Sequence, residues 1–540
     1  MIVLASERKA IAPPSPLFPP PEPVVMNMRF LPLLALFSMV STCPLAAADE
    51  AASLPNVLIL YADDMGFGDA SCYNPESKIT TPNIDRLARE GMRFVDGHSS
   101  SGICTPSRYA LLTGRYHWRK FHDIVGALGA SRFDAERLTL PEMLQQKGYD
   151  TACVGKWHLG WDWNAIRHPN AKKTTAAGGK QKYWGYDAFD WSKPVPDGPL
   201  AHGFDYYFGD TVINFPPYAW IENDRLISPP DANLEITAKT KEGNWEARPG
   251  PARSDWDFYD DLPTLTNKAV SWLASRKDQT KPFFLYFALP SPHAPIIPID
   301  KFDNASQAGA YGDYVVQSDW SCGELLKTLD KIGLAENTIV VFTSDNGPEI
   351  YCYAREERFG HRSNNPLRGI KRDIYEGGHH VPFIVRWPGR VPADTTNEAL
   401  ISQIDVMATL AEVVGFDLPD GAAEDSYSQL SMLEGGSPVR TTLVHNTYRD
   451  RYALRDGKWL WINAPNGYHR PANKAWEARH DYPSDDHPQQ LFDLSTDLGQ
   501  RHNVVDSHED IAQRMAAQLQ QIREAGHSAP RLDDANQAGG

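Results

Sequence analysis

The chain has few cysteines and no surplus of positive charge. Six cysteines in 540 residues are too few for the disulfide framework that small secreted domains use in place of a large core. Acidic residues number 69 against 53 basic ones, which gives a formal net charge of −16. Because phosphate binding needs a surplus of Lys and Arg, nucleic acid is excluded as an expected partner. A polyanionic ligand of another kind would need a local basic patch.

The N-terminal region has no apolar segment long enough to cross a bilayer. The run from Phe30 to Val40 is too short, so no membrane anchor is expected. It follows Arg29 and precedes Ala46-Ala47-Ala48, an order typical of a secretory signal peptide. We therefore expect residues 1–48 to be a mis-assigned leader plus a signal peptide, with translation starting near Met26 or Met28 and cleavage near Ala48. The mature protein is then secreted or periplasmic.

Short, almost wholly apolar runs follow, and helical patterns alternate with them. Such runs are typical of strands buried on both faces of a parallel sheet. They lie at 56–62, 151–154, 283–289 and 338–343. Helical patterns start at Pro82, after Pro141 and at Cys322, and end at Gly91, Gly148 and Gly333. The alternation predicts a large α/β domain over residues 49–435, with a mostly parallel central sheet flanked by helices.

The composition changes after Gly435-Gly436-Ser437-Pro438. Apolar segments at 452–454 and 459–462 flank Asp456-Gly457, which predicts a hairpin. Residues 490–494 offer another strand, and Ser507 can cap a helix. Residues 436–540 are therefore predicted to form a smaller α+β domain with an antiparallel sheet, one helix and a disordered tail from Gly526.

Each of the four apolar runs of the large domain is followed by polar residues. In chain order these are Asp63 and Asp64, Lys156 and His158, His293, and Asp345 and Asn346. If the strands are parallel, these side chains meet at one edge of the sheet, where ligands of α/β proteins bind. The four Asp and Asn side chains offer only oxygen, which favours Ca²⁺ or Mg²⁺ over zinc. Solvation of a strand end, or an Asx turn before Gly347, is the competing interpretation.

The segment Cys104-Thr105-Pro106-Ser107-Arg108 indicates an anion site that contains a nucleophile. Pro106 can open a helix from Ser107 to Thr113, and Gly114 can close it. The sulfur of Cys104 then lies at a helix N-terminus, where a thiolate or a bound oxyanion is favoured. One turn along, the guanidinium of Arg108 can hold a tetrahedral oxyanion. The alternative is a helix-capping loop with a buried cysteine.

This segment continues to Leu112-Thr113-Gly114-Arg115 and resembles the signature of the formylglycine-dependent sulfatases, an arylsulfatase-like family of the alkaline phosphatase superfamily. The resemblance implies that a formylglycine-generating maturation enzyme oxidises Cys104 to Cα-formylglycine. It also implies that this residue binds one Ca²⁺, or Mg²⁺, together with the four oxygen ligands. The implied metal ligands are Asp63, Asp64, Cys104, Asp345 and Asn346.

The segment from Leu367 to Gly389 resembles a second long signature of the same family. It places Lys371 on the sulfate-binding lysine, Lys156 and His158 beside the formylglycine, and His293 near the departing ester oxygen. His379-His380 departs from this signature, because relatives commonly carry an apolar or small residue and then Arg at these two positions.

The resemblance also implies a mechanism. The metal, Lys156, Lys371 and Arg108 neutralise the sulfate group while a hydroxyl of the formylglycine hydrate attacks sulfur. His293 protonates the leaving alcohol. His158 then takes a proton from the second hydroxyl, so that sulfate is expelled.

The substrate is expected to be a sulfated carbohydrate. Residues 161–261 form a long insertion rich in aromatic residues, which suit sugar faces or simply pack the insertion. Basic residues Arg355, Arg358, His361 and Arg362 suggest a polyanion. Two other functions remain open: a formylglycine-dependent phosphonate or phosphodiester hydrolase, and a non-catalytic binder of sulfated glycans. Two-zinc phosphatases of the superfamily carry His where Asn346 stands, so one metal is expected here.

Overall fold

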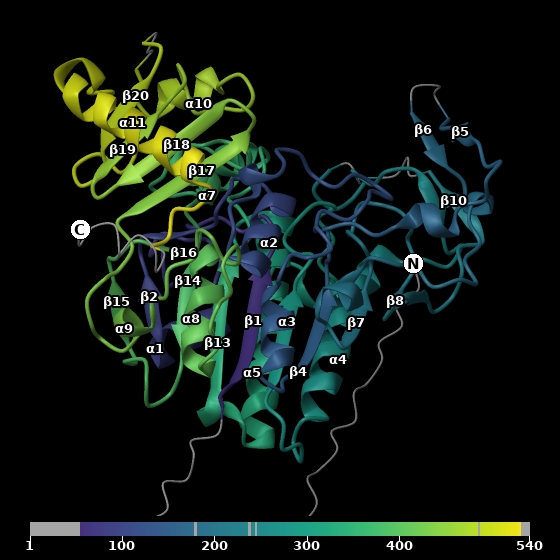
Figure 1. The fold of residues 1–540 in the computed structure, drawn as a ribbon. Helices are drawn as coiled ribbons and strands as arrows, with labels where there is room; N and C mark the ends of the chain where they lie inside the picture. Colours follow the sequence, from purple (N-terminus) through teal and green to yellow (C-terminus); the bar gives the residue numbers. More distant parts are fainter. Residues whose placement is uncertain (1–53, 178–180, 236–238, 244–245, 484–486, 531–540) are drawn as a thin grey trace, which may run out of the picture. The chain divides into compact units, whose positions relative to one another are not determined.

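A ten-stranded sheet forms the centre of the protein (Figure 1). The computed structural model describes residues 54–177, 181–235, 239–243, 246–483 and 487–530. In spatial order the strands are β15 (Thr395–Asn397), β2 (Met92–Phe94), β14 (Phe383–Arg386), β13 (Thr338–Ser344), β1 (Asn56–Ala62), β12 (Phe283–Ala288), β4 (Asp150–Gly155), β7 (Tyr206–Gly209), β8 (Ile221–Glu222) and β9 (Arg225–Leu226). The predicted signal peptide, at 1–48, lies outside the described residues.

The five middle strands, β13, β1, β12, β4 and β7, are parallel. Ile59 of β1 is opposite Tyr286 of β12 and Val341 of β13. β14 and β8 join this group antiparallel on either side. The predicted α/β fold with a mostly parallel sheet is therefore confirmed.

Helices cover both faces of the sheet, because alternate residues of each strand point to opposite sides. Val57, Ile59 and Tyr61 belong to one core cluster, and Leu58 and Leu60 belong to the other. The first cluster includes residues of α2 (Cys104–Thr113), α3 (Leu140–Gln146) and α8 (Val406–Val414). The second includes residues of α1 (Pro82–Glu90), α4 (Asp261–Ala274) and α5 (Gly309–Ile332). The side chains of β1, β12 and β13 are thus buried on both faces of the sheet, which explains their continuous apolar runs.

Helices differ from the prediction at several ends, and α11 (Glu509–Ala525) has His508 at its N-cap in place of the predicted Ser507, with no side-chain cap bond. α2 begins at Cys104 rather than Ser107, and it ends at Gly114, whose φ of 63° is left-handed as predicted. α5 begins at Gly309, well before the predicted start at Cys322. Its first half packs Tyr311, Tyr314 and Val315 into the core but also buries polar residues such as Asp313 and Asp319, which interrupt the apolar pattern.

The C-terminal part contains the predicted antiparallel sheet and helix. Its strands are β17 (Thr442–Tyr448), β18 (Arg451–Asp456), β19 (Trp459–Ile462) and β20 (Gln490–Asp493), and its long helix is α11 (Glu509–Ala525). Met515 and Leu519 of α11 share a core with Leu443 of β17 and with Tyr116 and Trp118 of the large domain. The sheet thus packs on the segment that follows α2.

The predicted tail is ordered at its start. The backbone N–H groups of Ser528 and Ala529 donate to the carbonyl of Glu424 at 3.0 and 3.1 Å. Residues 531–540 lie outside the described part.

The remaining elements are short. They are β3 (Gly97–His98) paired with β16 (Ile401–Ser402), β5 (Lys173–Thr175) with β6 (Lys182–Trp184), β10 (Ala232–Leu234) with β11 (Gly250–Ala252), and helices α6 (Cys352–Phe359), α7 (Glu376–His379), α9 (Leu430–Leu433) and α10 (Lys474–Arg479). None of the helices in the described ranges combines the length and apolar character that a bilayer span requires.

Candidate active site

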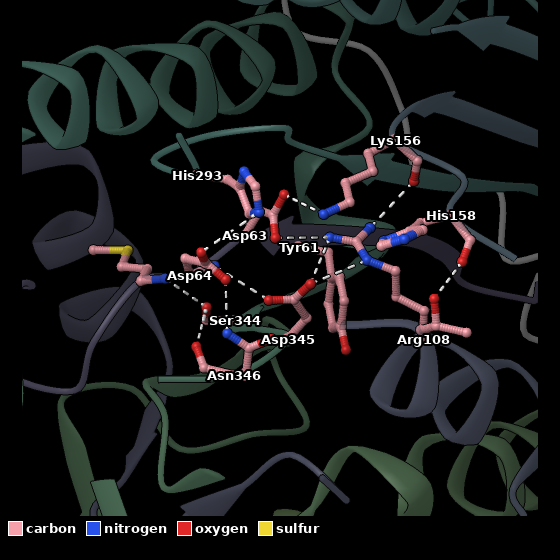
Figure 2. A network of polar contacts seen from close by, with 12 residues as sticks. Tyr61, Asp63, Asp64, Arg108, Lys156, His158, His293, Ser344, Asp345 and Asn346 are labelled. Atoms are coloured by element: carbon pink, nitrogen blue, oxygen red, sulfur yellow. Dashed lines mark hydrogen bonds and ion pairs between the residues drawn. The ribbon is translucent and has the colours of Figure 1, made fainter. Parts of the chain in front are cut away.

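The carboxyl ends of four parallel strands bring the predicted site residues together (Figure 2). Asp63 follows β1, Lys156 follows β4, His293 lies five residues beyond β12, and Asp345 follows β13. Backbone hydrogen bonds continue the sheet past its strands. The N–H of Asp345 donates to the carbonyl of Ala62 at 3.1 Å, and that of Lys156 donates to Ala288 at 2.8 Å. Side chains from distant parts of the sequence therefore start from fixed positions.

Two lysines neutralise the paired aspartates. Lys156 Nζ lies 2.6 Å from Asp63 Oδ2, and Lys371 Nζ lies 2.6 Å from Asp64 Oδ1. Asn346 Nδ2 also donates to Asp64 Oδ1 at 2.8 Å. Burial by itself would raise the pKa of Asp64, but the charge of Lys371, followed by those of His293 and Lys156, holds this pKa below its ordinary value. The carboxylate is therefore ionised at neutral pH.

The same residues fit a hard cation. Asp63 Oδ1, Asp64 Oδ2 and Asn346 Oδ1 are buried and have no hydrogen-bond partner among the described residues. Leaving several such acceptors unpaired is costly unless a cation or another donor binds them. Ligand atoms of Asp63, Asp64 and His293 also lie within 4.8 Å of one another. The donor set thus fits Ca²⁺ or Mg²⁺, and His293 is a nearby nitrogen that the sequence did not suggest as a ligand.

The guanidinium of Arg108 is bonded to Asp345, and its role in holding an oxyanion stays a prediction. Its Nη2 and Nε donate to Asp345 Oδ2 at 2.8 and 3.1 Å, and Nη1 donates to the carbonyl of Lys156 at 3.1 Å. Burial, followed by the charge of Asp63, raises the pKa of Asp345 to about 6, although Arg108 opposes this shift. Arg108 therefore positions a candidate metal ligand.

Cys104 is the first residue of α2 and lines a cavity of about 340 Å³. Burial raises the pKa of its thiol, although the charges of Lys156 and Lys371 act in the opposite direction. The predicted stabilisation of a thiolate by the helix N-terminus is therefore outweighed. As a thiol, Cys104 is a poor nucleophile, because the thiolate is the reactive form.

His158 offers a free imidazole nitrogen beside Cys104. Its Nε2 donates to the carbonyl of Val125 at 2.9 Å, and its buried Nδ1 has no hydrogen-bond partner in the part of the chain that the structure describes. The hydroxyl of Thr105 on α2 donates to the carbonyl of His158 at 2.8 Å, which fixes the loop to the helix. Burial, with the charges of Lys156 and Arg108, lowers the pKa of His158 well below its ordinary value. The neutral ring can accept a proton at Nδ1.

His293 lines the same cavity as His158. Its Nδ1 donates to the carbonyl of Ala294 at 2.5 Å, and its Nε2 lies 3.7 Å from Asp64 Oδ2. Burial, followed by the charge of Lys371, lowers the pKa of His293 to about 3, against the opposing effect of Asp64. The ring is neutral in this state, with the lone pair of Nε2 toward the site.

The basic residues at the cavity differ from those predicted. Arg355 is buried and bonds Glu242 at 2.7 and 2.8 Å, while His361 bonds Asp69 at 2.7 Å. Neither these two nor Arg358 and Arg362 lines the cavity. Its basic residues are instead Arg248, Arg372 and Arg470, together with Lys371. Arg372 could have been suspected from its position beside Lys371, whereas Arg248 and Arg470 carry no motif.

Most aromatic residues of the 161–261 insertion pack its interior. Trp163, Tyr207 and Tyr218 are at most 3% exposed. Phe215 is different because it lines the cavity, beneath the guanidinium of Arg248 at 4.7 Å. Trp245 lies outside the described residues. Packing therefore accounts for most of these rings, whereas Phe215 reaches the cavity.

A mostly parallel sheet that presents carboxylates and lysines beside a helix N-terminus defines a hydrolase of the alkaline phosphatase superfamily. The chain belongs to the sulfatase family within it and is a sulfuric ester hydrolase: the sulfatase family model matches residues 55–416. The model for the C-terminal part of N-sulphoglucosamine sulphohydrolase matches residues 370–525.

Curated relatives and a solved structure agree with this assignment. The chain is 32% identical to an N-acetylgalactosamine-6-O-sulfatase of Bacteroides thetaiotaomicron, over 92% of this chain and 99% of that protein. It is 32% identical to human arylsulfatase A, over 85% of each. A solved sulfatase structure from work on glycosaminoglycan metabolism by Bacteroides thetaiotaomicron has a TM-score of 0.72 at 31% identity, and covers 88% of this chain and 100% of that one.

Proposed function

We propose that this sulfatase removes sulfate from a sulfated carbohydrate, using formylglycine formed from Cys104 and one Ca²⁺ or Mg²⁺. The observation that carries the proposal is the set of buried oxygens of Asp63, Asp64 and Asn346 that lack a hydrogen bond within the described residues, in a site close enough to Cys104 for Asp63 to act on the pKa of its thiol. We further propose that the protein is exported through its N-terminal signal peptide and that a separate maturation enzyme oxidises Cys104.

The metal would lie between Asp63, Asp64, Asp345 and Asn346, with the modified residue 104 completing the site. When present, the metal would neutralise sulfate oxygens and the hydrated aldehyde would supply the nucleophilic hydroxyl. Lys371 and Lys156 contribute positive charge that stabilises the transferring group. Arg108 keeps Asp345 in place through its bonds at 2.8 and 3.1 Å.

The two histidines suit the two proton transfers. His158 has its hydrogen on Nε2, bound to Val125, so Nδ1 is available to take a proton from the modified residue. His293 presents Nε2 on the other side of the cavity. A bound sulfate ester would bring negative charge close to this ring, which favours its protonation. The protonated Nε2 would then donate to the departing alcohol oxygen.

The proposed substrate carries further negative groups beside the scissile sulfate. Arg248 and Arg470 are exposed, and both line the cavity together with Arg372. These guanidinium groups would bind sulfates or carboxylates of neighbouring sugars. The relative that acts on N-acetylgalactosamine 6-sulfate supports a sugar of this kind.

Kinetics on a matched pair of esters test the reaction type. An aryl sulfate and the aryl phosphate with the same leaving group are compared on metal-replete protein whose peptide 94–108 carries formylglycine by mass spectrometry. Sulfate monoesters carry one negative charge and phosphate monoesters nearly two, so a site with one metal should give the higher kcat/KM on sulfate. A preference for the phosphate, or for a phosphonate ester, would contradict the proposal. Full activity of protein that contains only unmodified Cys104 would contradict the role of formylglycine.

A further inference from the structure

Three buried histidines from distant parts of the chain meet behind the loop that carries Cys104. His98 belongs to β3, His379 ends α7, and His445 lies on β17. Their ring centroids are 5.3 Å apart for His98 and His379, 5.2 Å for His98 and His445, and 3.4 Å for His379 and His445. We call these three residues the histidine cluster. None of them lines the cavity of the active site.

The outer nitrogens of two of the rings are bonded to acceptors. His98 Nε2 lies 2.8 Å from Asp96 Oδ1, and His379 Nε2 lies 3.3 Å from the carbonyl of Ile374. With a hydrogen on each of these nitrogens, both Nδ1 atoms carry lone pairs. The two Nδ1 atoms are only 3.1 Å apart, so these lone pairs point at each other. A cation between the two Nδ1 atoms would accept both lone pairs and so remove the repulsion.

The third ring contacts the other two but makes no side-chain hydrogen bond within the described ranges. Both nitrogens of His445 are buried and lack a hydrogen-bond partner among the described residues. A proton shared between His98 and His379 would relieve their contact, but it would leave His445 unpaired. It would also place the Nε2 lone pair of His379 against the carbonyl of Ile374. A ligand bound by all three rings accounts for more of the geometry than a shared proton does.

We propose that His98, His379 and His445 form a second metal site, which binds one Zn²⁺ or a similar first-row transition metal ion. Three imidazole nitrogens suit such ions, whereas Ca²⁺ prefers oxygen. The bonds from His98 to Asp96 and from His379 to a backbone carbonyl are the outer hydrogen bonds that orient metal-binding histidines. Ligand atoms of the three residues already lie within 4.8 Å of one another. Closing the site requires the His445 ring to turn away from its stack on His379, and no hydrogen bond of that ring has to break.

A second group of neighbouring side chains is less suited to a metal. Asp96, His98, Glu376 and His380 also come close together. His380, however, is already bonded on both sides, to Glu376 Oε2 at 2.9 Å and to the carbonyl of Val95 at 2.7 Å. Asp96 is further bound by Arg455 at 3.0 Å. This group therefore supports the histidine cluster from outside.

The position of the site implies a structural role. The N–H of Ser99 donates to the carbonyl of His379 at 2.8 Å, and the hydroxyl of Ser101 donates to the carbonyl of Asn446 at 2.8 Å. A metal bound to the cluster would fasten the loop before Cys104 to α7 and to the C-terminal sheet. The metal would thus stabilise the fold around the active site without contacting the substrate.

Metal analysis of the full-length protein tests the site. Protein purified without a metal-affinity tag is incubated with ZnSO₄ in the presence of CaCl₂, desalted and analysed by mass spectrometry of the elements. We expect one zinc per chain, and X-ray absorption at the zinc edge should show imidazole ligands without sulfur. A zinc content far below one per chain, or a zinc bound by oxygen alone, would overturn the proposal. Both measurements use the unaltered chain, so they do not depend on the folding of a variant.

Substitutions then locate the metal. His379→Leu and His445→Leu should reduce zinc to a trace, while Asp64→Asn, in the oxygen site, should keep it. His117→Gln is the matched control, because His117 is as buried as His445 but belongs to no group of three ligand side chains in the described ranges. Zinc retained in both leucine variants, or lost in His117→Gln or Asp64→Asn to the same degree, would refute the assignment to the cluster.

Discussion

Single residues behind the active site control the groups that line it. Arg108 is fully buried and contacts Asp345, the Lys156 carbonyl, the Tyr286 hydroxyl, and the face of Tyr61 at 5.2 Å. A guanidinium can make all of these contacts at once because it is planar and carries five donors. The sequence motif places Arg108 in the site, but only the structure shows that it acts through Asp345.

Arg108→Lys should weaken metal binding. A lysine keeps the charge but cannot donate to Asp345 from two nitrogens while also reaching Lys156, so Asp345 would lose its fixed orientation. Loss of such outer contacts typically costs about 10- to 100-fold in metal affinity or activity. Activity measured against added CaCl₂, after chelation, should show this shift. Arg358→Lys, at an exposed position outside the cavity, is the control. An unchanged calcium dependence in Arg108→Lys would refute the positioning role.

His117 should make the fold sensitive to acid. Burial lowers its pKa to about 3. Since an unfolded histidine titrates near 6.5, the unfolded state binds the extra proton first, and stability falls as the pH drops below about 6.5. At pH 5 the loss from this residue is about 2 kcal/mol. His117→Gln should therefore lose less of its Tm between pH 7 and pH 5 than the unaltered protein does. An exposed-residue control, His502→Gln, should behave like the unaltered protein, and equal pH slopes in all three would contradict this account.

At the scale of elements, α5 has two different halves. Its second half carries the apolar stripe that predicts a helix, and its first half buries side chains that bond to other segments. Asp313 accepts hydrogen bonds from the backbone of Asn304 and Ser306 at 3.0 and 2.8 Å. Asp319 reaches the first turn of α1, where Ile84 N donates at 2.8 Å and Asn83 N at 3.0 Å. One helix thus caps the N-terminus of another.

Asp319→Ala should destabilise the protein. Thr81 precedes α1 but makes no side-chain cap bond to it, so Asp319 supplies the acceptor that these N–H groups need. Its removal leaves them unpaired in a buried position, at a cost of about 1–3 kcal/mol. The effect should appear as a lower Tm in calorimetry. Asp330→Ala, at an exposed site on the same helix, should change the Tm little. Equal shifts in the two variants would show that the cap is not important.

How well each element could be predicted depends on which of its residues are buried. β1, β4, β12, β13 and α11 have apolar patterns set by period and burial, so the sequence was sufficient to predict them. β7 was not predicted, because it lies in the insertion at 161–261, which has no regular pattern. α2 starts at Cys104, before the position that Pro106 suggested, because the boundary depends on contacts such as Thr105 with His158. The strand-end residues could be predicted to converge, since parallel strands share an edge. The cavity arginines could not, because Arg248 and Arg470 reach the site through irregular loops that have no period.

The whole molecule is acidic, while its cavity is lined by several arginines. The net charge of −16 repels a polyanion at long range. Arg248, Arg372 and Arg470 attract it locally, where Glu246 and Glu349 also line the wall. The protein should therefore select for anionic groups that reach the cavity and not for polyanions in general.

Arg248→Ala and Arg470→Ala should lower kcat/KM for large substrates and leave it unchanged for small ones. Each change removes an exposed cation that a neighbouring sulfate or carboxylate would bind, worth about 0.4–1 kcal/mol, or roughly two- to fivefold in kcat/KM. The loss should appear on a sulfated oligosaccharide and not on an aryl sulfate, and added salt should reduce the difference. Arg358→Ala serves as the control. An equal loss on both substrates would indicate a role at the scissile group instead.

The burial of Cys104 limits the period during which this residue is accessible. Only 3% of this residue is exposed in the folded protein, at the base of α2 and behind a loop that is bonded to Asn446 of β17. The ribosome makes residue 104 long before residue 446, and at about 5–20 residues per second the interval is tens of seconds. During this interval the C-terminal sheet does not yet exist, so the segment around Cys104 is not yet covered by it. If Cys104 is converted to formylglycine as proposed, the conversion has to come before the chain closes over this residue. The fraction of active molecules in a preparation would then depend on the relative rates of translation and modification.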